Sequence, residues 1–272
     1  MSTKSVRANE GVLLIERRFE RPAVEDGDGW TGEPARPTRT DPAQLLEDIQ
    51  IEPLGVLLAA DMVDLCTAPL DSRLAELVDD LRHRLAHELG VVLPPVRFTV
   101  ERGLLPGTYR VLVDGETIAE SIAPPGRVMV IGADEGDPDD VHTVEPVFGL
   151  PVRWVRDDRA PTGADVSIAS REQAMAAHLS EIARAHAGTL LSRDDVVDLI
   201  DAVRRRHPAS TEEIDAGLLP LAVLHAVLRD LLESGTSIRN LRRILDELAP
   251  ALMRGASYDS LVEIASRAVR PA

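Results

Sequence analysis

The 272-residue chain has a formal net charge of -16, with 44% hydrophobic residues and only 3% aromatic residues. This excess of acidic side chains argues against general binding to nucleic acid or to anionic membranes, because both require clustered lysine and arginine. The single cysteine excludes an intramolecular disulfide and a structural zinc site of several cysteines, which fits a protein of the reducing cytoplasm.

The first 46 residues are predicted to be an extension with only partial order. Residues 11–22, GVLLIERRFERP, contain one strand-like piece, and residues 23–42 have the glycine- and proline-rich composition of a linker. No apolar run approaches the ~20 residues that span a bilayer. The N-terminus also lacks a signal-peptide pattern, so we expect no membrane insertion.

Residues 47–170 mix short strands with one clear helix. The helix is predicted over 71–89, where apolar residues recur at intervals of three and four and Gly90 follows as a stop. Asp114-Gly115 is a tight-turn signal between two alternating segments and predicts a hairpin over 108–121. Further strands are predicted within 49–60, 96–100, 126–132 and 165–170.

From Ser170 to its end the sequence is helical. Ser170 and Ser192 each open a capping-box pattern, and Pro220 fits the first turn of a third helix. Ser237 is the predicted cap of a fourth helix, and a fifth covers about 257–268. The order of these elements predicts a helical module that follows an α/β module.

Two groups of residues resemble metal ligands. His83 and His87 share one helical face, but Arg84 follows His83 where a zinc-protease helix has glutamate, and no third ligand is apparent. The acidic stretch 133–140 lacks the complete pattern of a calcium loop and is interpreted as a solvated turn. We therefore predict no metal site.

The remaining residues give no catalytic set. His178, His186 and His225 lie on or beside apolar helical stripes, which indicates packed imidazoles with hydrogen-bonding partners. The chain has no glycine-rich phosphate loop, no Gly-x-Ser-x-Gly motif and no cysteine-histidine arrangement. The sequence predicts no enzyme, no catalytic residue and no cofactor.

One aromatic-rich stretch, EPVFGLPVRWV at 145–155, stands out in a chain with so few rings. Pro146 and Gly149 indicate an irregular backbone that can hold Phe148 at a groove, where an exposed ring would anchor a partner's apolar side chain. The alternative is that Phe148 and Trp154 pack one part of the fold onto another. Both interpretations stay open on these residues.

Four motifs in order resemble one known family. They are LGVVLPPVRF with LPGTYRVLVDGETIAES, then EPVFGLPVRWV, AAHLSEIARAHAGTLLSRDDVVDLIDAVRRRHP, and LLPLAVLHAVLRDLLESGTSIRNLRRILDELA. Together they are similar, over about 50–268, to the cytoplasmic part of the FHIPEP family, the FlhA-type export gates of type III secretion. The family's transmembrane half and its last subdomain have no counterpart among these motifs.

The resemblance implies an α+β fold with a split α/β subdomain, a small inserted β-rich subdomain and a helical subdomain. The α/β subdomain would be 47–122 plus 160–175, the inserted one 123–159, and the helical one 176–272.

The resemblance also implies a function without catalysis. The family's domain forms a homo-oligomeric ring and docks export substrates and chaperones in a dimple between the first two subdomains. Residues Glu145 and Phe148 match the family's dimple motif, and Ala177 occupies a position where the family pattern has threonine. The predicted partner-binding set is Glu145, Pro146, Phe148, Gly149, Trp154 and Ala177. The alternatives are an adaptor repurposed for a system other than secretion and a metal-dependent enzyme.

Overall fold

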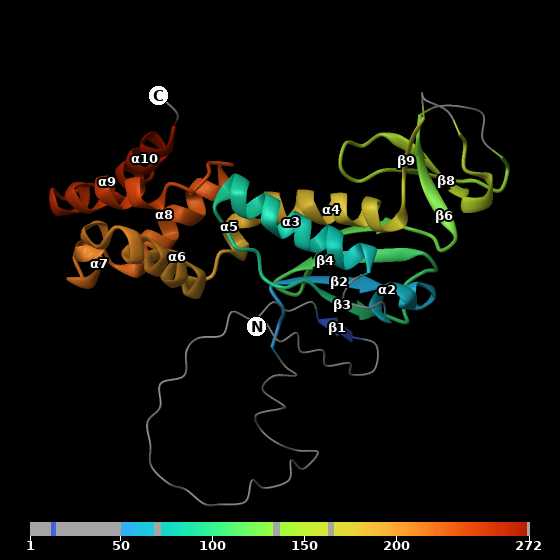
Figure 1. Ribbon diagram of the computed structural model, residues 1–272, viewed down its shortest axis with the longest axis horizontal. Coiled ribbons are helices and arrows are strands. Elements are labelled where there is room, and N and C mark those ends of the chain that lie inside the picture. The colour runs from blue at the N-terminus through green and yellow to red at the C-terminus, as the bar shows by residue number, and fades with distance from the viewer. Residues whose placement is uncertain (1–11, 15–49, 68–71, 133–136, 163–165, 271–272) are drawn as a thin grey trace, which may run out of the picture.

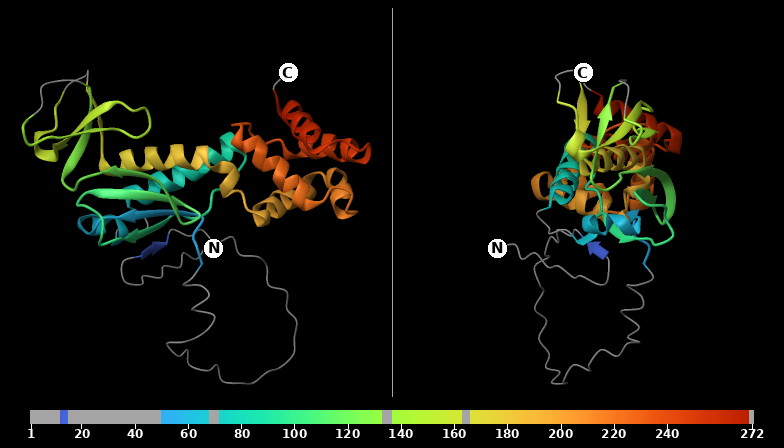
Figure 2. Two further views of the ribbon diagram at one scale, coloured as in Figure 1. Left: turned by 180° about the vertical axis from the view of Figure 1, so that it is seen from behind. Right: turned by 90° about the vertical axis from the view of Figure 1, so that its right-hand side faces the viewer.

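The computed structural model describes residues 12–14, 50–67, 72–132, 137–162 and 166–270. Figure 1 shows three regions along the long axis of the molecule: a small sheet at one end, a larger sheet with two long helices in the middle, and a helical bundle at the other end. The views in Figure 2 show the same order. The fold is α+β, as the sequence predicts.

The larger sheet, sheet A, has five strands in the order β1-β3-β2-β4-β5. Their bounds are β1 Val12–Leu14, β2 Leu54–Leu58, β3 Arg97–Val100, β4 Thr108–Val113 and β5 Glu116–Ile122. Only β2 and β3 are parallel neighbours. Apart from β1, the predicted N-terminal extension lies outside the described residues.

The predicted hairpin is formed by β4 and β5. Asp114 and Gly115 join the two strands with φ values of 49° and 80°. A two-residue type I′ turn requires positive φ at both central residues, which aspartate tolerates and glycine favours. The local sequence therefore determines this connection.

Two long helices, α3 (Arg73–Leu89) and α4 (Arg171–Ala185), pack together and cover one face of sheet A. Val56, Phe98 and Val111 are neighbours across three strands, and all three are buried in the core that these helices share with the sheet. The strands alternate, so every second residue enters this core. Before α3 the chain makes the short helices η1 (Ala60–Met62) and α2 (Val63–Thr67).

Gly90 joins the middle region to the helical bundle. It ends α3 with φ +83°, and a Cβ at this position would lie 2.5 Å from the backbone nitrogen of Arg239. The neighbouring Leu89 carbonyl accepts a 2.7 Å hydrogen bond from the Ile238 amide. Glycine is therefore required here by the backbone conformation and also by the close approach of the bundle.

The smaller sheet, sheet B, has the strand order β7-β8-β6-β9, and all its pairs are antiparallel. Its strands are β6 Arg127–Ile131, β7 Val141–Val144, β8 Pro151–Arg156 and β9 Ser167–Ala169, and η2 (Asp157–Arg159) follows β8. β9 pairs with β6, so this strand belongs to the inserted sheet, whereas the sequence division assigns 160–175 to the α/β subdomain.

The helical bundle contains four of the five predicted helices and several short ones, because the first predicted helix, from Ser170, is α4 and packs against α3. The bounds are α5 Ala187–Leu190, α6 Arg193–Arg206, η3 Pro208–Thr211, α7 Glu212–Asp215, α8 Leu221–Glu233, α9 Leu241–Met253 and α10 Tyr258–Val269. Pro220 precedes α8 as its N-cap instead of lying in the first turn. The helix expected from Ser237 begins only at Leu241, because Ile238 is buried at the junction and bonded to Leu89.

Within the described ranges, no helix has the length and apolar character needed to cross a bilayer.

Candidate functional site

The stretch 145–150, called the 145–150 turn below, connects β7 to β8 and is organised by one carboxylate. The Glu145 side chain accepts hydrogen bonds from the backbone amides of Val147 at 2.8 Å, Phe148 at 2.5 Å and Leu150 at 3.3 Å. Only 5% of Glu145 is exposed. Both of its carboxylate oxygens are therefore used inside the turn, and Glu145 holds the turn rather than facing a partner.

Gly149 completes the same turn. Its amide donates to the Glu145 carbonyl at 3.2 Å, and the Glu145 amide donates to the Leu150 carbonyl at 2.9 Å. The φ of Gly149 is +69°, and a Cβ built there would meet no atom within 4 Å. Glycine is thus needed for backbone conformation and not for space. Pro146 is exposed at the beginning of the turn.

The turn presents apolar side chains to solvent. Phe148 is 80% exposed, Val144 is 59% exposed and Leu150 is 43% exposed. Trp154, in β8, is only 1% exposed and belongs to the main core with Met129. The two rings of this stretch therefore have different environments: Phe148 is available to a partner, and Trp154 packs sheet B onto the rest of the fold.

Tyr109 of β4 and His178 of α4 form a buried polar pair between sheet A and the helix that covers it. The Tyr109 hydroxyl lies 2.9 Å from His178 Nδ1, and the rings meet edge to face with centroids 5.7 Å apart. Burial lowers the pKa of His178 to about 4 and raises the pKa of Tyr109, so both groups are neutral at neutral pH. The negative charge of Glu145 is a smaller influence that raises the pKa of both residues.

Ala177 lies on α4 immediately before His178. It is exposed, whereas His178 is buried. Helix α4 contacts β6 and β9 of sheet B, so Ala177 lies on the helix that joins this sheet to the α3–α4 layer. Of the predicted set, Pro146, Phe148, Gly149 and Ala177 offer surface, and Glu145 and Trp154 support it.

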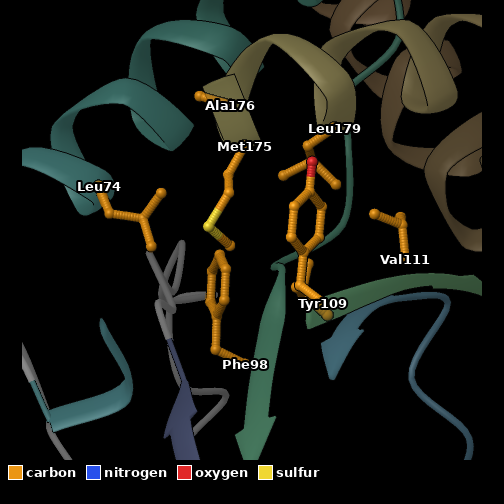
Figure 3. Close-up of a pocket in the computed structure, with 8 residues that line it drawn as sticks. Leu74, Phe98, Tyr109, Val111, Met175, Ala176 and Leu179 are labelled. Carbon is orange, nitrogen blue, oxygen red and sulfur yellow. The ribbon is translucent and has the colours of Figure 1, made fainter. Parts of the chain in front are cut away.

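One gap lies in the core between sheet A and helices α3 and α4. Figure 3 shows Phe98 and Tyr109 rising from the sheet toward Met175 and Leu179 of α4, with Leu74 of α3 beside them. The gap between these side chains holds no water-sized space. It is therefore a packing irregularity and not a binding site for a small molecule.

The histidines considered as metal ligands lie on the surface of α3. His83 and His87 are exposed, and His83 Nδ1 is 2.8 Å from the Asp79 carbonyl. In the part of the chain that the structure describes, no three histidine, cysteine, aspartate or glutamate side chains are grouped as metal ligands. Four residues of the acidic stretch, 133–136, lie outside that part.

The sequence predicts that His178 and His225 have hydrogen-bonding partners, but it does not identify those partners. His178 pairs with Tyr109, and the Nε2 of His225 is 2.8 Å from the Leu191 carbonyl, so both are the packed imidazoles that the helical stripes indicate. His186 ends α4. The Tyr109–His178 contact was not predicted, because it joins residues 69 positions apart in sequence. The only sequence signal for this contact is a histidine on the apolar stripe of a helix.

The sequence of the chain is similar to that of proteins of one known family. The sequence model of the FHIPEP family matches residues 12–271. The flagellar biosynthesis protein FlhA of Proteus mirabilis is 31% identical over 234 residues, covering 81% of this chain and 33% of the relative. FlhA of Escherichia coli is 32% identical over 209 residues, covering 74% of this chain and 30% of the relative. The chain thus spans about a third of the length of these relatives.

Solved structures share the fold at lower identity. The CdsV protein of Chlamydia pneumoniae has a TM-score of 0.68 at 20% identity, covering 81% of this chain and 67% of that chain. The nonameric SctV-C of EPEC has a TM-score of 0.58 at 18% identity, covering 81% of this chain and 66% of that chain. The chain belongs to the FHIPEP family.

Proposed function

We propose that this chain is a non-enzymatic docking module that works in the cytoplasm and receives partner proteins of an export apparatus at the 145–150 turn. The observation that carries the proposal is Phe148, a large ring that is 80% exposed on a turn fixed by the carboxylate of a buried residue, Glu145. Exposed aromatics on a rigid support are typical anchors for a partner's apolar side chain. Membership of a family of export-gate proteins supports the choice of partner class.

The test uses export chaperones, alone and loaded with their substrates, from the organism that encodes this chain. Binding to the immobilised chain is measured for the wild type, Phe148→Asp and Met253→Asp. Met253 is the matched control, because it is 66% exposed on α9 at the opposite end of the molecule. We expect Phe148→Asp to weaken binding by about tenfold or more, which corresponds to the loss of one anchor side chain. Equal binding by all three proteins would show that Phe148 is not an anchor for the partner.

We also propose that copies of the chain assemble into a ring. The SctV-C protein of EPEC is described as nonameric, and this chain shares its fold. The net charge of -16 opposes close packing unless charges pair across the contact, so assembly should depend on salt. Mass photometry across a series of protein concentrations and ionic strengths tests this proposal. Monomers under every condition would contradict it.

The second candidate function, an adaptor in a system other than secretion, is favoured by Ala177. This exposed residue cannot donate or accept a side-chain hydrogen bond where the family pattern has threonine. If the chain still serves export, Ala177→Thr should preserve or strengthen chaperone binding. If Ala177→Thr weakens binding of the chain's own partner, the position has adapted to a different one, and the adaptor function is favoured.

A further inference from the structure

In the described part of the chain, strand β7 forms one edge of sheet B, and no strand pairs with its outer side. Its residues pair with β8 in the register Val141 with Trp154, His142 with Arg153, Thr143 with Val152, and Val144 with Pro151. Proline has no amide hydrogen, so the pair of Val144 and Pro151 is not a hydrogen-bonded pair of the ladder.

The next step follows from the alternation of an antiparallel ladder. Hydrogen-bonded and non-hydrogen-bonded pairs alternate, so Val144 and His142 both direct their N–H and C=O groups away from β8. Glu145 and Leu150, just beyond the strand, are a hydrogen-bonded pair, which agrees with this alternation because the adjacent pair of Val144 and Pro151 is not hydrogen-bonded. No hydrogen bond to these outward groups is found within the described part of the chain. Two residues thus offer four backbone groups to one further strand.

The other described edges are protected in ways that β7 is not. Sheet A has two edge strands: β1 is described over only three residues, and β5 carries Glu116 and Glu120 and pairs with β4 across a register shift. β9 has only three residues and leads directly into α4. Charged side chains, irregular pairing and short length all prevent a strand from pairing with another chain. β7 has the residues Val-His-Thr-Val, which include no lysine, arginine, aspartate, glutamate or proline, and its pairing with β8 has no bulge.

Apolar side chains are concentrated beside this edge. Val141 is 37% exposed and Val144 is 59% exposed on β7 itself, and Phe148 and Leu150 follow directly in the 145–150 turn. Val144 also shares a sheet face with Ile168 of β9, which is 42% exposed. An added strand would therefore cover apolar surface while its backbone completes the outward hydrogen bonds.

The charge of the inserted sheet defines the kind of strand that fits. The described residues between 127 and 169 include six acidic and four basic residues, a net charge of 4 − 6 = −2, and the whole chain has a net charge of -16. All four arginines are already engaged: Arg153 pairs with Asp140, Arg159 with Asp137 and Arg156 with Asp158, and Arg127 donates to the carbonyls of Asp139 and Trp154. A net negative charge attracts a basic segment and repels an acidic one.

We propose that β7 accepts an extended segment of a partner protein as a fifth strand of sheet B, and that this segment alternates basic with apolar residues. Main-chain hydrogen bonds to His142 and Val144 provide the affinity, and the acidic surroundings with the apolar side chains provide the selection. The inference rests on the proposed function, because it specifies how a docked partner is held beside Phe148.

The first experiment uses defined peptides as probes. A capped peptide of alternating lysine and valine, six residues long, is compared with the glutamate-valine peptide of equal length, by fluorescence anisotropy on the full chain. We expect the lysine peptide to bind and the glutamate peptide to bind at least about tenfold more weakly. Equal binding of both peptides, or no binding of the lysine peptide at about 1 mM, would overturn the inference, since an added strand with complementary charge should bind at that concentration.

The second experiment removes one outward amide. Val144→Pro deletes the N–H that faces the open edge while leaving the ladder to β8 intact, because this residue is in a non-bonded pair. Val144→Thr is the matched control, which retains the amide and the branched side chain. Binding of the lysine peptide should fall by about tenfold in Val144→Pro and change less than about threefold in Val144→Thr. Amide exchange of β8 verifies that sheet B is still folded in both variants.

The third experiment leaves the protein unchanged. The lysine peptide is N-methylated at alternate residues, in one version on the three amides of one edge and in the other version on the three amides of the opposite edge. Strand addition uses only one edge of the peptide, so one version should lose binding and the other should retain it. Equal binding of both versions would overturn the inference.

These outcomes are separate from failure of the proposed function. If Phe148→Asp leaves chaperone binding unchanged while Val144→Pro abolishes peptide binding, the edge is a docking strand and Phe148 is not an anchor. If Phe148→Asp abolishes chaperone binding while Val144→Pro has no effect on either ligand, the anchor stands and the strand inference is wrong.

Discussion

Phe148 and Trp154 lie six positions apart in sequence, yet their rings have opposite environments. Trp154 lies in the regular strand β8, where alternation directs it into the core, and it is 1% exposed. Phe148 lies in the 145–150 turn, where the backbone follows the carboxylate of Glu145 and the positive φ of Gly149, and it is 80% exposed. Burial is thus determined by the backbone that carries each ring, although both side chains are strongly apolar.

This difference separates stability from binding in one short stretch. A strand residue that faces the core contributes to the free energy of unfolding, and a turn residue that faces solvent contributes little to it. The Phe148 ring has no such role in the fold, so its exposure points to a use outside the fold. The comparison therefore predicts large effects on stability from Trp154 and its neighbours, and effects on binding from Phe148.

The largest effect on stability is expected at Trp154. Trp154→Ala removes the largest fully buried side chain and should lower the free energy of unfolding by about 3–5 kcal/mol, measured by urea denaturation. Trp154→Phe is the milder comparison, because it keeps a ring and removes an indole N–H that has no hydrogen-bond partner among the described atoms. A loss below about 1 kcal/mol in Trp154→Ala would show that the ring is not part of the core.

The next effect is the pH dependence caused by His178. Its pKa is about 4 in the folded chain and about 6.5 when unfolded, because burial disfavours the charged form more than Glu145 favours it. The unfolded state therefore takes up a proton that the folded state does not, and stability falls as pH decreases from about 6.5 to about 4. The loss should be about 3 kcal/mol, since each pKa unit is worth about 1.4 kcal/mol.

Denaturation of the wild type and His178→Gln across this pH window measures the contribution of His178. The variant should lose correspondingly less stability on acidification, because glutamine does not titrate. Parallel pH profiles for the two proteins would mean that His178 is not kept neutral by burial.

A smaller effect is expected at Glu145. Glu145→Ala leaves the amides of Val147, Phe148 and Leu150 without their acceptor and should cost about 2 kcal/mol, because part of this turn can bond to water instead. Hydrogen exchange should accelerate at these three amides, and Glu145→Gln, which retains one acceptor oxygen, should be intermediate. Unchanged protection at these amides in Glu145→Ala would contradict the anchoring role.

The sequence predicts well those features of the fold that depend on neighbouring residues. Helix starts at Ser170 and Ser192 and the Asp114-Gly115 turn depend on neighbouring residues only, and all three are present. Pro146 and Gly149 indicated an irregular backbone, and the turn has one. The features that sequence reasoning did not predict depend on contacts between distant residues.

Three cases show why these features could not be predicted. β9 joins β6 across about 36 residues, so no local pattern could assign it to sheet B. The start of α9 moves to Leu241 because Ile238 is held by Leu89, on the other side of the junction. Glu145 is predicted as a partner-binding residue from its match to the family's dimple motif, whereas in the structure its oxygens accept hydrogen bonds from the turn itself.

The most direct measurement compares stability and binding in Phe148→Asp. The account predicts that the free energy of unfolding changes by less than about 0.5 kcal/mol, as for an exposed site, while chaperone binding weakens by about tenfold or more. Stability that falls by several kcal/mol, or binding that equals that of the wild type, would contradict the claim that this ring serves a partner and not the fold.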